Sequence, residues 1–162
     1  MAPALDLVLR HNLWANRALL EFCAALDPAA LERTMPGTYG TLLETIKHIV
    51  SGEQWYVSLL SGEQLGEPVE EKEPRPMDEL MSIASRTGER LLELARSDDG
   101  DRPVKNDEGE TWTAGVIYAQ VVHHGNEHRA QVKSILGAGG IEPPGLSAWG
   151  YAMDTGLGPK ES

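Results

Sequence analysis

Hydrophobic residues recur at intervals of three and four positions in four long segments of the chain. This spacing places them along one face of an α-helix, and such a face is buried when helices pack together. The segments cover residues 5–26, 41–61, 77–97 and 114–138. We therefore predict an all-α protein whose four long helices form a four-helix bundle within a single domain, residues 1–162.

Capping signals mark the ends of these helices. Thr41 opens the sequence Thr-Leu-Leu-Glu, a capping box in which the threonine hydroxyl caps the first turn and Glu44 reaches back. Thr113 is a good N-cap for the last long helix. Asp27 precedes Pro28 and ends the first helix, because the residue before a proline disfavours helical backbone angles.

The connecting segments differ in composition. Residues 61–76 are rich in glutamate and proline and predict a solvated loop, whereas residues 97–112 carry turn signals that can form a small hairpin. The C-terminal tail, residues 141–162, contains too much glycine and proline for a long helix. We expect it to be irregular and to pack in part against the bundle through Leu146, Trp149 and Tyr151.

Composition narrows the classes of partner. The chain of 162 residues is 41% hydrophobic and carries a formal net charge of -11, so we expect neither nucleic acid nor an anionic membrane surface as a partner. The N-terminal residues do not resemble a signal peptide, and no segment has the length of a membrane span. Cys23 is the single cysteine. A chain that forms no internal disulfide fits a reducing cytoplasm, which is the location we expect.

Three of the five histidines lie within residues 123–128. On a helical wheel, His124 and His128 fall on the apolar stripe of the last long helix, whereas His123 points about 100° away from His124. Histidines four positions apart can bind one metal ion from the same side. Two core histidines with hydrogen-bond partners are the alternative. The stripe consists of Ile117, Val121, His124, His128, Val132 and Ile135.

A tetrahedral metal site needs a further ligand from another helix. His48 is the best candidate, although the wheel places it on the shoulder of its helix, where a histidine is more often a boundary residue. Three histidines from two helices would leave one coordination position open, as catalytic zinc sites do. His11 is expected at the surface or boundary.

The sequence His-Gly-Asn-Glu-His at residues 124–128 also fits the inverted zincin motif, in which Glu127 is the general base of a peptidase. That motif needs an acidic ligand on a further helix downstream. Only the tail rich in glycine and proline follows, so the sequence disfavours a peptidase. Glu127 can instead be a solvated helix residue or an acceptor for a ligand imidazole.

Three stretches resemble the DinB-like (YfiT-like) superfamily: NLWANRALLEF from residue 12, TLLETIKHIVSGEQWYVSLLSG from residue 41, and VVHHGNEHRAQVKSILGAGGIEPP from residue 121. The resemblance runs over nearly the whole chain. Its strongest parts are a histidine followed seven residues later by tryptophan, and the block H-x-x-x-H-R-x-Q. It implies a four-helix bundle, commonly a homodimer, with a divalent metal ion held by His48, His124 and His128.

The resemblance implies several activities rather than one. The superfamily includes transferases that use low-molecular-weight thiols, proteins labelled metal-dependent hydrolases, and proteins associated with stress. We therefore expect a zinc or nickel ion and a small-molecule substrate, with a thiol as a further co-substrate. Glu53 and Glu127 are the nearest acidic candidates for proton transfer, and Trp55 and Tyr56 can line a pocket or pack in the core. The alternative is a non-catalytic protein whose metal ion is structural.

Overall fold

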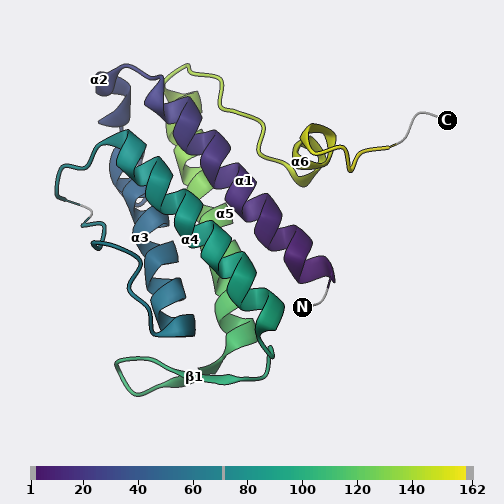
Figure 1. Ribbon diagram of the computed structural model, residues 1–162. Coiled ribbons are helices and arrows are strands. Elements are labelled where there is room, and N and C mark those ends of the chain that lie inside the picture. Colours follow the sequence, from purple (N-terminus) through teal and green to yellow (C-terminus); the bar gives the residue numbers. More distant parts are fainter. Residues whose placement is uncertain (1–2, 71, 160–162) are drawn as a thin grey trace.

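The computed structural model describes residues 3–70 and 72–159 of the chain, and these are mainly helical. The prediction of an all-α bundle is confirmed (Figure 1). The elements, in chain order, are α1 (Pro3–Ala24), α2 (Pro28–Leu31), α3 (Leu42–Ser61), α4 (Met77–Ser97), β1 (Pro103–Lys105), β2 (Thr111–Thr113), α5 (Ala114–Ala138) and α6 (Ala148–Asp154).

The predicted capping residues begin α3 and α5. The Thr41 hydroxyl accepts a hydrogen bond from the backbone N–H of Glu44, and the Glu44 carboxylate accepts one from the Thr41 N–H. Thr113 caps α5 through the N–H of Val116. Asp27 and Pro28 end α1 but also begin α2, a short helix absent from the prediction, because the Asp27 carboxylate accepts from the N–H of Ala29.

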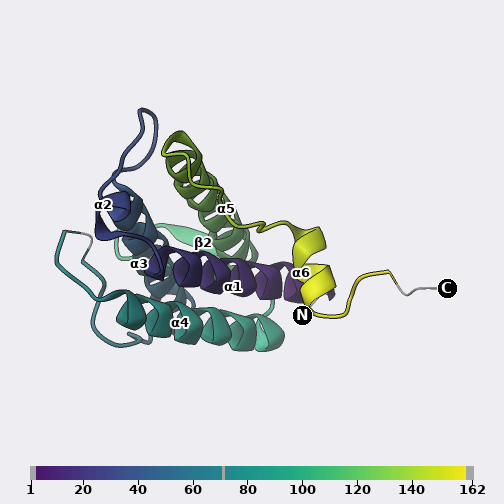
Figure 2. The ribbon, with the colours of Figure 1, turned by 90° about the horizontal axis from the view of Figure 1, so that it is seen from above.

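The four long helices pack in two closely associated pairs. Helix α1 lies mainly against α4, and α3 lies mainly against α5, with further contacts between α3 and α4 and between α1 and α5 (Figures 1 and 2). The pairing of α3 with α5 matters most here, because these two helices carry the three histidines that the sequence singles out.

The buried core has two hydrophobic clusters. The α2-end cluster is built around Leu19, Leu42, Leu80 and Ile135, and the hairpin-end cluster around Leu9, Val57, Leu91 and Val121. Along each long helix, the residues of one cluster precede those of the other. Buried polar residues lie at or beside the junction of the two clusters on all four helices, among them Asn12, Asn16, Glu53, Thr87, His128 and Arg129.

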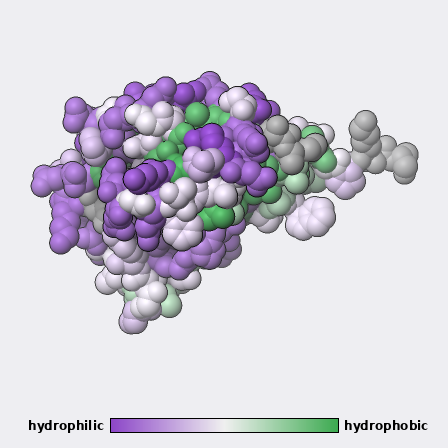
Figure 3. Space-filling view, turned by 90° about the horizontal axis from the view of Figure 1, so that it is seen from below, coloured by the Kyte–Doolittle hydropathy of each residue, from purple (hydrophilic) through white to green (hydrophobic). Residues whose placement is uncertain are grey.

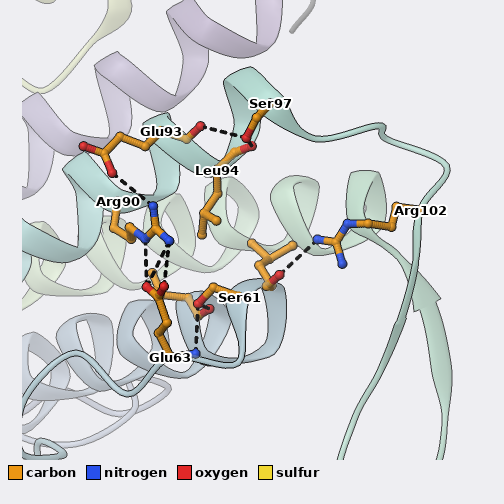
Figure 4. A network of polar contacts seen from close by, with 9 residues as sticks. Ser61, Glu63, Arg90, Glu93, Leu94, Ser97 and Arg102 are labelled. Atoms are coloured by element: carbon orange, nitrogen blue, oxygen red, sulfur yellow. Dashed lines mark hydrogen bonds and ion pairs between the residues drawn. The ribbon is translucent and has the colours of Figure 1, made fainter.

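Polar contacts hold the predicted hairpin against the end of the bundle. Strands β1 and β2 pair antiparallel, with Val104 opposite Trp112. Arg102, which precedes β1, donates to the Asp98 carboxylate and to the backbone carbonyl of Leu60 at the end of α3. Figure 4 shows the contact of Arg102 with the Leu60 carbonyl beside a second link, in which Arg90 on α4 donates to Glu63, just after α3.

The C-terminal segment packs on α1 through part of its apolar residues. Leu146 and Tyr151 are buried, as expected, and the Tyr151 ring lies edge-on to that of Trp14. Trp149 was expected to pack inward, but it is 83% exposed. The tail also contains the short helix α6, which Ser147 caps through the N–H of Gly150. Within the described residues, none of the helices combines the length and the hydrophobicity that a membrane crossing requires.

Candidate metal centre

His48, His124 and His128 converge between α3 and α5. His124 and His128 are one helical turn apart on α5, and His48 reaches them from the facing side of α3. The Nε2 atoms of His48 and His124 lie 3.1 Å apart, and one ligand atom from each of the three residues falls within 4.8 Å of the others. The structure therefore brings together all three histidines that the sequence nominated.

The environment keeps His124 neutral. Its side chain is partly buried beside two other imidazoles, and His128 is 7% exposed. Burial, followed by the charges of His128 and His48, lowers the pKa of His124 to about 4. Neutral imidazole is the form that binds metal ions, because its unprotonated nitrogen offers a lone pair.

Gly52 makes room for the His124 ring. It lies four residues after His48 on α3, so both face α5. A Cβ atom at Gly52 would lie 2.6 Å from Cε1 of His124 and 3.3 Å from each ring nitrogen. Only glycine leaves this ring in its observed place. Helical periodicity does not indicate this role, because the clash involves a residue 72 positions away along the chain.

Gln131 fixes the orientation of His128. Its side-chain oxygen accepts a hydrogen bond from the backbone N–H of Tyr39 at 2.9 Å and lies 3.2 Å from Nδ1 of His128. A backbone N–H can only donate, so the shared atom is the amide oxygen, and Nδ1 of His128 carries the proton. The Nε2 atom of His128 then carries no proton, and its lone pair is the one that can bind a metal ion. Such a partner for a ligand imidazole is typical of metal sites.

Tyr39 covers the centre from the loop between α2 and α3. Its ring stacks on that of His48 at a centroid distance of 3.9 Å and an interplanar angle of 14°, and it meets the His128 ring edge-on. Tyr39 itself is 46% exposed to solvent. Sequence reasoning did not identify Tyr39, because a single aromatic residue in a loop rich in glycine carries no periodicity.

These residues fit a divalent metal ion. Two nitrogen ligands of one zinc ion, each about 2.0–2.1 Å from the metal, lie about 3.3 Å apart in a tetrahedral site. The 3.1 Å separation of the two Nε2 atoms is close to this value. Among the described residues, the buried side-chain atom found without a hydrogen-bond partner is Nδ1 of His124, the nitrogen on the other side of this ring from the one near His48. The three histidines could hold a metal ion.

A buried polar layer supports the centre from behind. Asn12 and Asn16 on α1 each donate to Oε1 of Glu53 at 2.7 Å, and their own oxygens accept from Arg129. The layer therefore connects a carboxylate on α3 with a guanidinium on α5, the residue that follows His128. Thr87 on α4 donates to the other oxygen of Glu53.

Burial shifts the pKa values of both charged groups of this layer, Glu53 and Arg129. It raises the pKa of Glu53, against the opposing effect of the hydrogen bonds from the two asparagines and of the Arg129 charge. It lowers the pKa of Arg129 to about 10. Gly125 lets α5 approach α1 here, since a Cβ atom would lie 2.6 Å from the Asn12 oxygen. The layer joins the four long helices around the α5 turn that carries His124 and His128.

Comparison with known proteins now places the fold. The family model described as DinB family matches residues 1–160. The chain belongs to the DinB family. A solved structure of a DinB-like protein from Bacillus cereus ATCC 10987 is similar to this DinB-family chain, with a TM-score of 0.68 and 17% sequence identity, covering 85% of this chain and 92% of that one. At 17% sequence identity, this structural similarity supports the fold alone. No match is found among curated proteins.

The two acidic candidates lie in different environments. Glu53 is 1% exposed and belongs to the polar layer of the DinB-family protein, so it is neither a solvated helix residue nor a member of the histidine cluster. The Glu127 side chain is 54% exposed and lies 3.5 Å from that of His123, which is also at the surface. Within residues 3–70 and 72–159, the cluster contains no Asp, Glu or Cys. This arrangement does not favour the inverted zincin interpretation.

The remaining candidates divide between core and surface. Tyr56 is 6% exposed, and its ring lies edge-on to that of His124 at a centroid distance of 5.8 Å. Trp55 is 51% exposed, so it does not pack in the core. His11 is partly buried, as expected for a boundary residue, and its Nε2 lies 2.9 Å from the Leu146 carbonyl oxygen.

Proposed function

We propose that this DinB-family protein is a metal-dependent enzyme acting on a small molecule. In this proposal His48, His124 and His128 hold a divalent ion, zinc or nickel, and the reaction is transfer of a low-molecular-weight thiol to an electrophilic substrate or a hydrolysis. The observation that carries the proposal is the convergence of three imidazoles, one of them with a strongly lowered pKa, on one small volume between α3 and α5.

The ligand set suits catalysis. A zinc-type ion held by three histidines lowers the pKa of a coordinated water or thiol, which supplies a nucleophile at neutral pH. The protein's own residues keep the ligands in place: Gln131 orients His128, Tyr39 stacks on His48, and Gly52 leaves space for His124. Because Glu127 points to solvent and Glu53 is sealed in the polar layer, proton transfer would involve solvent or the substrate.

The second candidate is a non-catalytic, stress-related protein in which the ion joins α3 to α5. The two hydrophobic clusters argue against it, since both are complete without a metal ion. An ion that is mainly structural would be required for folding, whereas a catalytic ion would be removable from a folded protein.

Metal content tests the ligand set. Protein prepared without a histidine tag should contain about one equivalent of zinc or nickel by elemental analysis. His48→Ala, His124→Ala and His128→Ala should each lose most of it, because a site with two histidines binds an ion weakly. His123→Ala is the matched control, since its side chain is exposed on the same helix. Full metal content in all three variants would contradict the proposal.

Spectroscopy tests the thiol. Cobalt-substituted protein should develop a sulfur-to-metal charge-transfer band when a low-molecular-weight thiol is added, and the band should be absent in His128→Ala. An unchanged spectrum at millimolar thiol would exclude thiol coordination and leave hydrolysis as the proposed reaction.

The proposal includes a cytoplasmic homodimer that binds neither nucleic acid nor membranes. Its support is the family resemblance, the frequency of two-fold homodimers, and the net charge of -11. Multi-angle light scattering at micromolar concentration should give twice the monomer mass of 17.6 kDa, and a monomer mass would contradict the dimer.

A further inference from the structure

A cavity of about 470 Å³ lies between the hairpin, the C-terminal half of α3 and the start of α5. We call it the hairpin cavity. Its volume is in the range of pockets that bind small molecules. Trp55, Trp112 and Val116 line it and are 51%, 48% and 49% exposed. Seen from the hairpin end, hydrophobic surface is exposed in patches among hydrophilic residues (Figure 3). Two half-exposed tryptophans on one cavity offer a large apolar surface to a ligand.

The charged residues of the hairpin cavity all have the same sign. Asp107, Glu108 and Glu110 line it, and the described residues of its lining include no lysine or arginine. A ligand with a negative charge would be repelled by the three carboxylates. A positive charge would be attracted by them and also by the faces of the tryptophan rings.

The hairpin turn holds this lining in place. The Glu110 carboxylate accepts hydrogen bonds from the Asn106 side chain at 3.0 Å and from Nε1 of Trp112 at 3.4 Å. Asn106 also accepts from the backbone N–H of Glu110. Gly109, with φ of 87°, allows the tight turn between them. One carboxylate and one aromatic ring are therefore positioned together before any ligand arrives.

The hairpin cavity adjoins the metal centre. Tyr56 belongs to its lining, and the Tyr56 ring lies 5.8 Å from the His124 ring. Gln120, also in the lining, precedes His124 by one helical turn on α5. A ligand that fills the cavity therefore contacts Tyr56, and the Tyr56 ring lies between that ligand and His124.

We propose that the hairpin cavity binds a small organic cation with an apolar body, a hydrophobic amine or quaternary ammonium compound, as the substrate pocket beside the metal centre. The role as substrate pocket rests on the proposed metal-dependent function, whereas binding of the cation does not. The carboxylates hold the positive group, and the tryptophans and Val116 cover the apolar body.

Three probes of similar size and different charge test the proposal. Isothermal titration calorimetry should detect benzyltrimethylammonium at submillimolar to millimolar concentration. The neutral benzyl methyl sulfone should bind about tenfold more weakly, and the anionic benzylsulfonate should not bind measurably. Equal binding of all three, tighter binding of the anion, or no binding of the cation would overturn the proposal.

Charge neutralisation locates the site. The triple variant Asp107→Asn, Glu108→Gln and Glu110→Gln should bind the cation about tenfold more weakly. Trp112→Ala should lower the affinity for the cation and for the neutral probe by the same factor. The matched control is Glu21→Gln, Glu32→Gln and Glu142→Gln, which removes the same net charge at exposed positions outside the cavity. An equal loss of affinity in the control would show that only the overall charge matters and would overturn the proposal.

The same titration in His128→Ala separates this inference from the proposed function. Cation binding should persist there within about threefold, even though the variant has lost its metal. If the wild-type protein binds the cation but no metal ion, the proposed function is wrong and the proposed cation site remains. If the wild-type protein binds the metal ion but not the cation, the proposed cation site is wrong and the metal-dependent function remains.

Discussion

The position of His124 depends on the absence of a side chain at Gly52. In Gly52→Ala, the added Cβ would lie 2.6 Å from the His124 ring, so the ring must move away from His48 and His128. We expect the affinity for zinc to fall about tenfold, the loss typical of disturbing the support of a metal ligand. Competition with a chelating dye measures it.

The control for this variant is Gly137→Ala on α5. A Cβ at Gly137 meets nothing within 4 Å, so metal affinity should be unchanged and the helix more stable by roughly 0.5–1 kcal/mol. If Gly52→Ala binds zinc as tightly as the wild type, the observed position of the His124 ring is not needed for metal binding.

At the scale of residues, periodicity predicted the site only where it acts within one helix. His124 and His128 share an apolar stripe, so their common direction follows from the sequence. The convergence of His48 was implied by family resemblance, and the structure provides it. Tyr39, Gly52 and the partners of Glu53 depend on contacts between distant segments, which helical periodicity does not encode.

At the scale of elements, the ends of the long helices were predictable because capping is local. The Thr41 capping box and the Thr113 N-cap are confirmed where the sequence placed them. The short helices α2 and α6 were missed for a related reason: four to seven residues are too few to show periodicity, and the same Asp27-Pro28 pair that stops α1 also caps α2.

Asp98 joins the end of α4 to the hairpin and to α5. Its carboxylate accepts from Arg102 and from the Tyr118 hydroxyl, and the Arg102 hydrogen bond is the main reason that its pKa lies below the ordinary value of 3.8. We expect Asp98→Asn to lower the free energy of unfolding by about 1–2 kcal/mol at pH 7.

This contribution depends on pH with a defined sign. Because the folded pKa is lowered, the carboxylate stabilises the fold above pH 3.8, and the effect is lost as pH falls through the folded pKa. Urea titrations of wild type and Asp98→Asn should therefore differ at pH 7 and converge as the pH falls below the folded pKa of Asp98. Asp101→Asn, exposed in the same turn, is the control. A difference between wild type and Asp98→Asn that persists undiminished at low pH would contradict this assignment.

At the scale of the whole molecule, the polar layer gives the bundle one defined arrangement of four helices. Glu53→Gln removes the buried negative charge that faces Arg129 through Asn12 and Asn16. Hydrogen bonds to a buried charged group contribute about 1.5–3 kcal/mol, so we expect a loss of this size in the free energy of unfolding, measured by urea denaturation. Metal affinity should fall as well, because Arg129 adjoins His128 on α5.

Glu89→Gln is the matched control for the polar layer. Glu89 pairs with Arg17 at the surface, where its side chain is 59% exposed, and such pairs contribute at most about 1 kcal/mol. If Glu53→Gln is no more destabilising than Glu89→Gln, the buried layer does not hold the helices together.

Removal of the metal ion distinguishes the two functions proposed for the whole molecule. The α2-end and hairpin-end clusters are complete without it, so chelated protein should keep its helical circular dichroism spectrum. Zinc at about 100 times its dissociation constant adds roughly 2.7 kcal/mol of stability, which raises the melting temperature of a chain this long by about 5–10 °C. The increase should vanish in His128→Ala. Unfolding of the chelated protein at room temperature would instead favour a structural ion, because a catalytic ion has no need to hold the bundle together.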